Sequence, residues 1–156
     1  MAGITAVSLT ACSGPLAFDT LAVEAAPDSN NPNCAKIMLA MPKKVSDFKQ
    51  RETTSQGTTA YGDPSVLIVR CGLPAIQATS DPCVSVNDID WISKQDTEKP
   101  DTWIFTSYGK SPTVEVLLDN TKISSSDALV IFSDIMEKMP SNGHKCLSVK
   151  DVSLNQ

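Results

Sequence analysis

The sequence predicts one α+β domain with two layers, in which an antiparallel sheet of about four to five strands carries two flanking helices. Two observations predict this class. Apolar residues recur at helical spacing near both ends of the predicted domain, and short β-rich runs separated by turn signals lie between them. The order of helix, several strands, helix and strand is typical of α+β proteins. The predicted domain, residues 33–156, has a common size for a single hydrophobic core.

The first helix is predicted to begin at Asn31-Pro32, because asparagine caps helices and proline is tolerated in the first turn. Its apolar face is formed by residues at positions i, i+3, i+4 and i+7, namely Cys34, Ile37, Met38 and Met41. Pro42 ends it. Residues 43–64 are polar and close on a turn signal, so no strand is predicted there.

The strands are predicted from β-branched and aliphatic runs. Residues 66–69 predict a central strand that continues to Gly72. Asn87-Asp88 lies between two apolar strand halves and predicts a tight hairpin, because both residues tolerate positive φ. Residues 103–108 and 113–118 predict a second hairpin.

The second helix is predicted to begin after residues 124–126, three serines followed by an acid in the first turn. Its apolar face consists of Ala128, Leu129, Phe132, Ile135, Met136 and Met139. A last short strand is predicted through residues 147–149.

The N-terminus contains the pattern of a bacterial lipobox, Leu9-Thr10-Ala11-Cys12, preceded by a short apolar run. The run is shorter than the roughly 20 apolar residues that span a bilayer. This pattern predicts that residues 1–11 are a truncated signal segment and that Cys12 becomes the lipid-modified N-terminus. No Lys or Arg precedes the run, and the alternative is a chance match in an ordinary N-terminus.

The polar composition of residues 12–32 predicts a flexible tether between the lipid and the domain. The alternative is that part of this segment packs on the domain through Leu16, Phe18 and Leu21. Together these features predict a protein anchored at the outer face of the cytoplasmic membrane, in the cell envelope.

Four cysteines remain besides Cys12, and an even number in a secreted domain predicts two disulfides. We favour Cys71–Cys83, which closes a short loop between adjacent strands, together with Cys34–Cys146, which ties the two ends of the domain. The pairing Cys34–Cys71 with Cys83–Cys146 stays open. The cysteines lack the close spacing of a zinc site, so no metal is predicted.

The composition limits the classes of partner that the chain is expected to bind. The chain has a net charge of −5 and a mean hydropathy of −0.08, which indicates a folded domain, and its only basic cluster is Lys43-Lys44. This balance argues against nucleic acid and anionic headgroups as partners. Lys43-Lys44 is interpreted as a solvated helix end.

Two charged residues, Arg70 and Glu115, lie inside otherwise apolar strand runs. The plain interpretation is alternation, with both side chains in solvent and a cross-strand ion pair between them. The functional interpretation is a binding patch for a glycan, peptide or lipid headgroup. This patch consists of Arg70, Glu115, Asp90, Trp91, Trp103 and Tyr108, although the aromatic residues fit the core as well.

No motif names a reaction. The sequence has one histidine, His144, but no Gly-x-Ser-x-Gly motif that would supply the nucleophilic serine of a hydrolase. Neither a Walker loop nor a dinucleotide-binding fingerprint occurs. We therefore predict no catalytic residue and no cofactor. Asp90 and Glu115 are the carboxylates that a glycosidase-like pair would use.

Several short motifs resemble, in order and spacing, a family of actinobacterial secreted proteins and lipoproteins known only as domain of unknown function 3515. The resemblance covers most of residues 33–147. It rests on Cys34 with Met41-Pro42, on residues 69–74, 86–91, 106–116 and 125–129, and on Cys146-Leu147. It implies an envelope protein in a membrane-tethered setting and assigns no catalytic residue. The family pattern has Asn-Gly where this chain has Asn87-Asp88.

These observations predict a non-enzymatic, lipid-anchored domain that binds an envelope protein or glycan. The alternatives are a cell-wall polymer hydrolase or transferase that uses acidic residues, and an envelope assembly chaperone.

Overall fold

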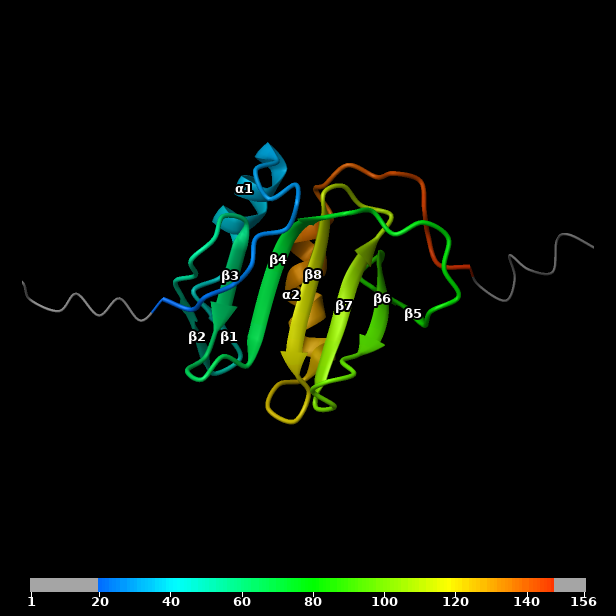
Figure 1. Cartoon of the computed structure of the whole chain (residues 1–156). Coiled ribbons are helices and arrows are strands. Elements are labelled where there is room, and N and C mark those ends of the chain that lie inside the picture. The colour runs from blue at the N-terminus through cyan, green and yellow to red at the C-terminus, as the bar shows by residue number, and fades with distance from the viewer. Residues whose placement is uncertain (1–19, 148–156) are drawn as a thin grey trace, which may run out of the picture.

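The computed structural model describes residues 20–147, which form one antiparallel sheet of eight strands with two helices against one of its faces (Figure 1). The helices are α1 (Pro32–Ala40) and α2 (Ser125–Met136). The strands are β1 (Lys44–Val45), β2 (Phe48–Arg51), β3 (Thr58–Tyr61), β4 (Leu67–Leu73), β5 (Cys83–Val86), β6 (Ile89–Gln95), β7 (Thr102–Tyr108) and β8 (Thr113–Asp119). Their order in the sheet is β1-β2-β3-β4-β8-β7-β6-β5.

The prediction of four to five strands is therefore wrong, and the three additional strands, β1 to β3, lie in the polar segment 43–64. Strand β3 shows the physical reason. All four of its residues are buried, yet its sequence is Thr-Thr-Ala-Tyr and has no apolar alternation. Its hydroxyls are satisfied by hydrogen bonds: Gln50 Nε2 donates to Thr59 Oγ1 at 2.9 Å, and Thr58 Oγ1 donates to the Ser55 carbonyl at 2.7 Å.

The locally encoded elements were predicted correctly. The side chain of Asn31 accepts a hydrogen bond from the Asn33 N–H at 3.0 Å and caps α1. Ser124 caps α2 in the same way through the Asp127 N–H. Asn87 and Asp88 turn the β5–β6 hairpin with φ of 49° and 60°. Strands β7 and β8 form the second predicted hairpin.

The hydrophobic core lies between the helices and the sheet. It contains large, fully buried side chains from both layers, among them Trp91, Tyr61, Phe132 and Ile37. Trp91 is 0% exposed and donates from Nε1 to Ser133 Oγ on α2 at 2.9 Å, so its one polar atom is satisfied inside the core. This contact fixes α2 against β6.

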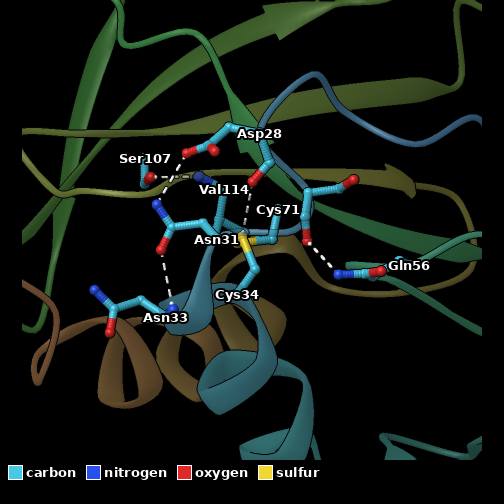
Figure 2. Close-up of a disulfide and its surroundings, with 9 residues drawn as sticks. Asp28, Asn31, Asn33, Cys34, Gln56, Cys71, Ser107 and Val114 are labelled. Carbon is cyan, nitrogen blue, oxygen red and sulfur yellow. Dashed lines mark hydrogen bonds between the residues drawn. A yellow bond between two sulfur atoms is a disulfide. The ribbon is translucent and has the colours of Figure 1, made fainter.

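Two disulfides are present, and their pairing corrects the one we favoured. Cys34 on α1 is bonded to Cys71 on β4, as Figure 2 shows, and Cys83 on β5 is bonded to Cys146. Strands β8, β7 and β6 lie between β4 and β5 in the sheet. At a strand spacing of about 4.8 Å, Cys71 and Cys83 lie roughly 19 Å apart, whereas a disulfide needs Cα atoms within about 7 Å. Strands β4 and β5 follow one another in the sequence but are not neighbours in the sheet.

The segment before α1 is part of the domain. Leu21 bridges Thr53 beside β2, Ala26 is 3% exposed, and the Asp28 N–H donates to the Gly72 carbonyl at 2.9 Å. Gly72 has φ of +98°, and a Cβ there would lie 2.3 Å from the Asp28 backbone, so this contact requires glycine. Residues 21–31, which were predicted to belong to the tether, are thus held to the sheet. The lipobox and residues 12–19 lie outside the described residues, as does the predicted last strand beyond Leu147.

Candidate functional site: the helix-free face of the sheet

The face of the sheet opposite the helices presents an alternating set of polar and aliphatic side chains. Arg70 on β4 lies directly opposite Glu115 on β8, and their side chains form an ion pair at 3.0 Å. Both are partly buried, with side-chain exposures of 25% and 14%. Arg70 Nε also donates to the Glu24 carbonyl, so the N-terminal segment covers one side of the pair. The cross-strand ion pair agrees with the plain interpretation, but that interpretation placed both side chains in solvent, and here they are mostly shielded from it.

A second polar group lies at the β5 side of this face. Asp90 on β6 lies opposite Tyr108 on β7. The carboxylate of Asp90 accepts from the Ser85 hydroxyl through Oδ1 and from the Cys146 N–H, at 2.6 Å, through Oδ2. The ring of Tyr108 packs on the ring of His144 with centroids 5.5 Å apart. Asp90 and Tyr108 therefore hold the C-terminal segment onto the sheet.

The two tryptophans do not belong to this face. Trp91 is in the core, and Trp103 is partly buried on the helix side, stacked on Phe105 with centroids 6.4 Å apart. The six predicted binding residues thus do not form one patch. The signal was available in the sequence, because Asp90 and Trp91 are consecutive in one strand and must point to opposite faces.

Two hollows open on the helix-free face. The first, of about 240 Å³, lies between the β6–β7 turn and strands β4 and β8, and its lining includes Ile68, Leu117, Asp96, Lys99 and Asp119. The second, of about 330 Å³, lies beside the Cys83–Cys146 bridge, and its lining includes Ile92 and Tyr108. Sequence reasoning missed the first hollow, because its residues come from turns and from strands that are far apart in the sequence.

The two carboxylates of the first hollow are held in their turns. Hydrogen bonds from the backbone N–H groups of Glu98 and Lys99 lower the pKa of Asp96 below its usual value. A hydrogen bond from the Thr121 hydroxyl is the main cause of the lowered pKa of Asp119. Both groups are therefore ionised at neutral pH and can accept hydrogen bonds from the hydroxyl or amide groups of a ligand.

The arrangement offers recognition chemistry more readily than proton transfer. Glu115 is paired with Arg70, and both oxygens of Asp90 are already engaged by groups of the chain itself. β7 separates the strands that carry these two carboxylates. Within residues 20–147, no three His, Cys, Asp or Glu side chains are grouped closely enough to hold a metal ion. The same residues contain no helix of the length and apolarity that crossing a bilayer requires.

An eight-stranded sheet with both helices on one face, two disulfides and an open opposite face defines the chain structurally as a small, disulfide-stabilised α+β protein. The family model described as "Protein of unknown function (DUF3515)" matches residues 2–143, and the chain belongs to that family. No curated protein and no solved structure matches significantly. The two glycines of the family-like motifs have visible roles. The lack of a Cβ at Gly72 leaves room for the backbone of Asp28, and the lack of one at Gly109 leaves room for the backbone of His144.

Proposed function

We propose that the chain is a lipid-anchored cell-envelope protein whose helix-free sheet face binds another envelope component, a protein or a glycan, without catalysing a reaction. The exposure of the helix-free face of the sheet is the observation that supports this proposal. The helices cover one face of the sheet. The opposite face presents Arg70, Glu115, Thr106 and Tyr108 between two hollows. A broad surface with fixed hydrogen-bonding groups and half-buried aliphatic side chains suits an extended polymer or a protein surface.

The cysteine inventory supports the anchor. Four of the five cysteines in the sequence form the two disulfides, and Cys12 is the fifth. Cys12 is also the cysteine that follows the lipobox pattern, and the family match includes this segment. Acylation gives this cysteine a chemical role that the disulfides do not.

Site-specific photocrosslinking in the native host tests the binding face. A photoreactive amino acid at Thr106, on the helix-free face, is expected to capture one defined envelope component. The same group at Ser126, exposed on α2, is the matched control and is expected not to capture it. Equal capture from both positions, or from neither, would contradict the proposal.

The anchor is tested separately by metabolic labelling with a palmitate analogue. The chain is expected to carry the label and Cys12→Ser to lose it, with release from the membrane fraction in a high-salt wash that removes electrostatically bound protein. A variant that stays in the membrane fraction through this wash without the label would contradict a lipid anchor at this position. The hydrolase alternative predicts instead a polymer-degrading activity that Asp90→Asn or Glu115→Gln abolishes while the fold persists.

A further inference from the structure

The β1–β2 hairpin gathers basic side chains that the sequence pattern did not bring together. Lys44 on β1 lies directly opposite Lys49 on β2, and Arg51 follows two residues later on the same strand. Lys43 precedes β1 and donates from Nζ to Gln50 Oε1 at 3.2 Å. We call Lys43, Lys44, Lys49 and Arg51 the basic edge, because β1 is the outermost strand of the sheet. The interpretation of Lys43-Lys44 as a helix end overlooked this hairpin.

The lysines of the basic edge are available to an anionic partner. All three are exposed, and together they line a surface hollow of about 610 Å³. Lys44 pairs with Asp47, but the two side chains are 55% and 93% exposed, so water weakens the pair. The Lys49 carbonyl accepts a hydrogen bond from the Gly62 N–H, but its ammonium group has no hydrogen bond or ion pair with any residue in the described range 20–147. Like charges that face each other across two strands destabilise the hairpin, and an anionic surface would relieve that repulsion.

The basic edge lies where the chain enters the domain. The Leu21 N–H donates to the Glu52 carbonyl at 2.9 Å, and the Thr54 N–H donates to the Leu21 carbonyl at 3.0 Å. Figure 1 shows this blue N-terminal segment arriving beside β2. Cys12 precedes Leu21 by nine residues, which reach at most about 30 Å when fully extended. An acyl group on Cys12 would therefore hold this edge near the headgroups.

We infer that the basic edge docks onto anionic lipid headgroups of the membrane that holds the anchor. The inference rests on the proposed membrane location, which keeps the hairpin close to the surface. At physiological salt the screening length is about 8 Å, so acidic groups elsewhere on this chain of net charge −5 are largely screened. Three acids at the hairpin offset part of its positive charge, because Asp47 pairs with Lys44, Asp63 pairs with Arg51, and Glu52 lines the same hollow. The four basic residues still leave this edge with a local positive excess. Docking through β1 places β5, seven strand spacings away, roughly 34 Å from the surface. The helix-free face then stands upright from the membrane and is open to its partner.

Vesicle sedimentation with the full chain as Cys12→Ser, which cannot be acylated, tests the docking. The chain is expected to bind phosphatidylcholine vesicles that contain about a third phosphatidylglycerol, and not pure phosphatidylcholine vesicles, with binding that weakens as salt rises. One lysine near an anionic surface contributes roughly a factor of 5 to binding, so Lys44→Gln/Lys49→Gln is expected to weaken it roughly 25-fold.

The matched control is Lys94→Gln/Lys99→Gln, which removes two exposed lysines near the β6–β7 turn and is expected to change binding less than about 2-fold. Circular dichroism and thermal unfolding check that both double variants fold. Equal loss in both, or equal binding to neutral vesicles, would overturn the inference and leave the lysines the role of preventing edge-to-edge pairing. Because the tested chain lacks the lipid, this outcome is independent of whether Cys12 is acylated.

Discussion

Replacing the Cys34–Cys71 bridge tests the architecture most directly. The bridge closes a loop with a sequence separation of 37 and joins α1 to β4. On the chain-entropy model, a loop of that length contributes about 3.8 kcal/mol at 25 °C. Both cysteines are 0% exposed, so Cys34→Ala/Cys71→Ala also leaves a cavity that adds roughly 1–2 kcal/mol. The total expected destabilisation is about 5–6 kcal/mol.

The second bridge provides the matched comparison. Cys83–Cys146 has a sequence separation of 63, for which the same model gives about 4.3 kcal/mol. Both of its residues are only partly buried, so Cys83→Ala/Cys146→Ala leaves little cavity. Removing Cys34–Cys71, which closes the shorter loop, should therefore lower the free energy of unfolding more than removing Cys83–Cys146. The reason is that the cavity left in the core outweighs the small difference in loop entropy. With an unfolding entropy of about 2.1 cal/mol/K per residue, the entropic part of the first bridge alone corresponds to a Tm decrease of about 14 °C.

Calorimetry and urea unfolding of the two double variants measure these differences under oxidising conditions. Mild reduction of the native chain should open Cys83–Cys146 first, because thiolates reach a partly exposed bridge before a buried one. Proteolytic mapping without reductant should link the peptides of Cys34 and Cys71. A link between Cys71 and Cys83, or a larger loss of stability in the Cys83/Cys146 variant, would refute the reasoning.

Three further predictions follow from single contacts. A double-mutant cycle of Arg70→Ala and Glu115→Ala should give a coupling of about 0.5–1 kcal/mol, since the ion pair is partly shielded from water; unfolding curves that add without coupling would contradict this. Gly109→Ala should destabilise the chain by roughly 1–3 kcal/mol more than Gly143→Ala, because both have positive φ but only the Cβ at 109 meets a backbone oxygen of the C-terminal segment, at 2.0 Å; equal Tm decreases would exclude the contact. Burial raises the pKa of Tyr61 to about 12 from 10, so the stability that its neutral hydroxyl contributes is fully present below pH 10 and is lost as pH rises from 10 to about 12. Between pH 10 and 12, the free energy of unfolding measured with urea should decrease less for Tyr61→Phe than for the unmodified chain. An identical pH dependence of the two proteins would contradict the raised pKa of Tyr61.

The elements that were predicted correctly are those with local signals. Asn31 and Ser124 cap their helices through hydrogen bonds to residues two and three positions later. Asn87-Asp88 supplies both positive φ values of its turn within two residues. In each case the residue that determines the structure and its hydrogen-bond partner or turn neighbour lie within one short window of sequence, where propensity and spacing are informative.

Strands β1 to β3 were missed because their stabilisation is not local. Gln50 and Thr59 are hydrogen-bonded to each other across two strands, and Tyr61 is fully buried in the core with its hydroxyl donating to the Pro42 carbonyl at 2.9 Å. A polar segment that becomes buried through such bonds has no apolar pattern to detect. The candidate site divides in the same way. Alternation predicted the Arg70–Glu115 pair, whereas the hollow between Asp96 and Asp119 arises only when the sheet assembles.

The sequence by itself determined the helix caps, the tight hairpins, the presence of two disulfides and the family. Only the tertiary structure decided the order of the strands, the partner of each cysteine and the gathering of the lysines at β1–β2. The physical reason is the range of the interactions. Caps and turns are made within a few residues, whereas the disulfides join positions 37 and 63 residues apart, and the partner at such a distance is selected by the packing of the whole sheet.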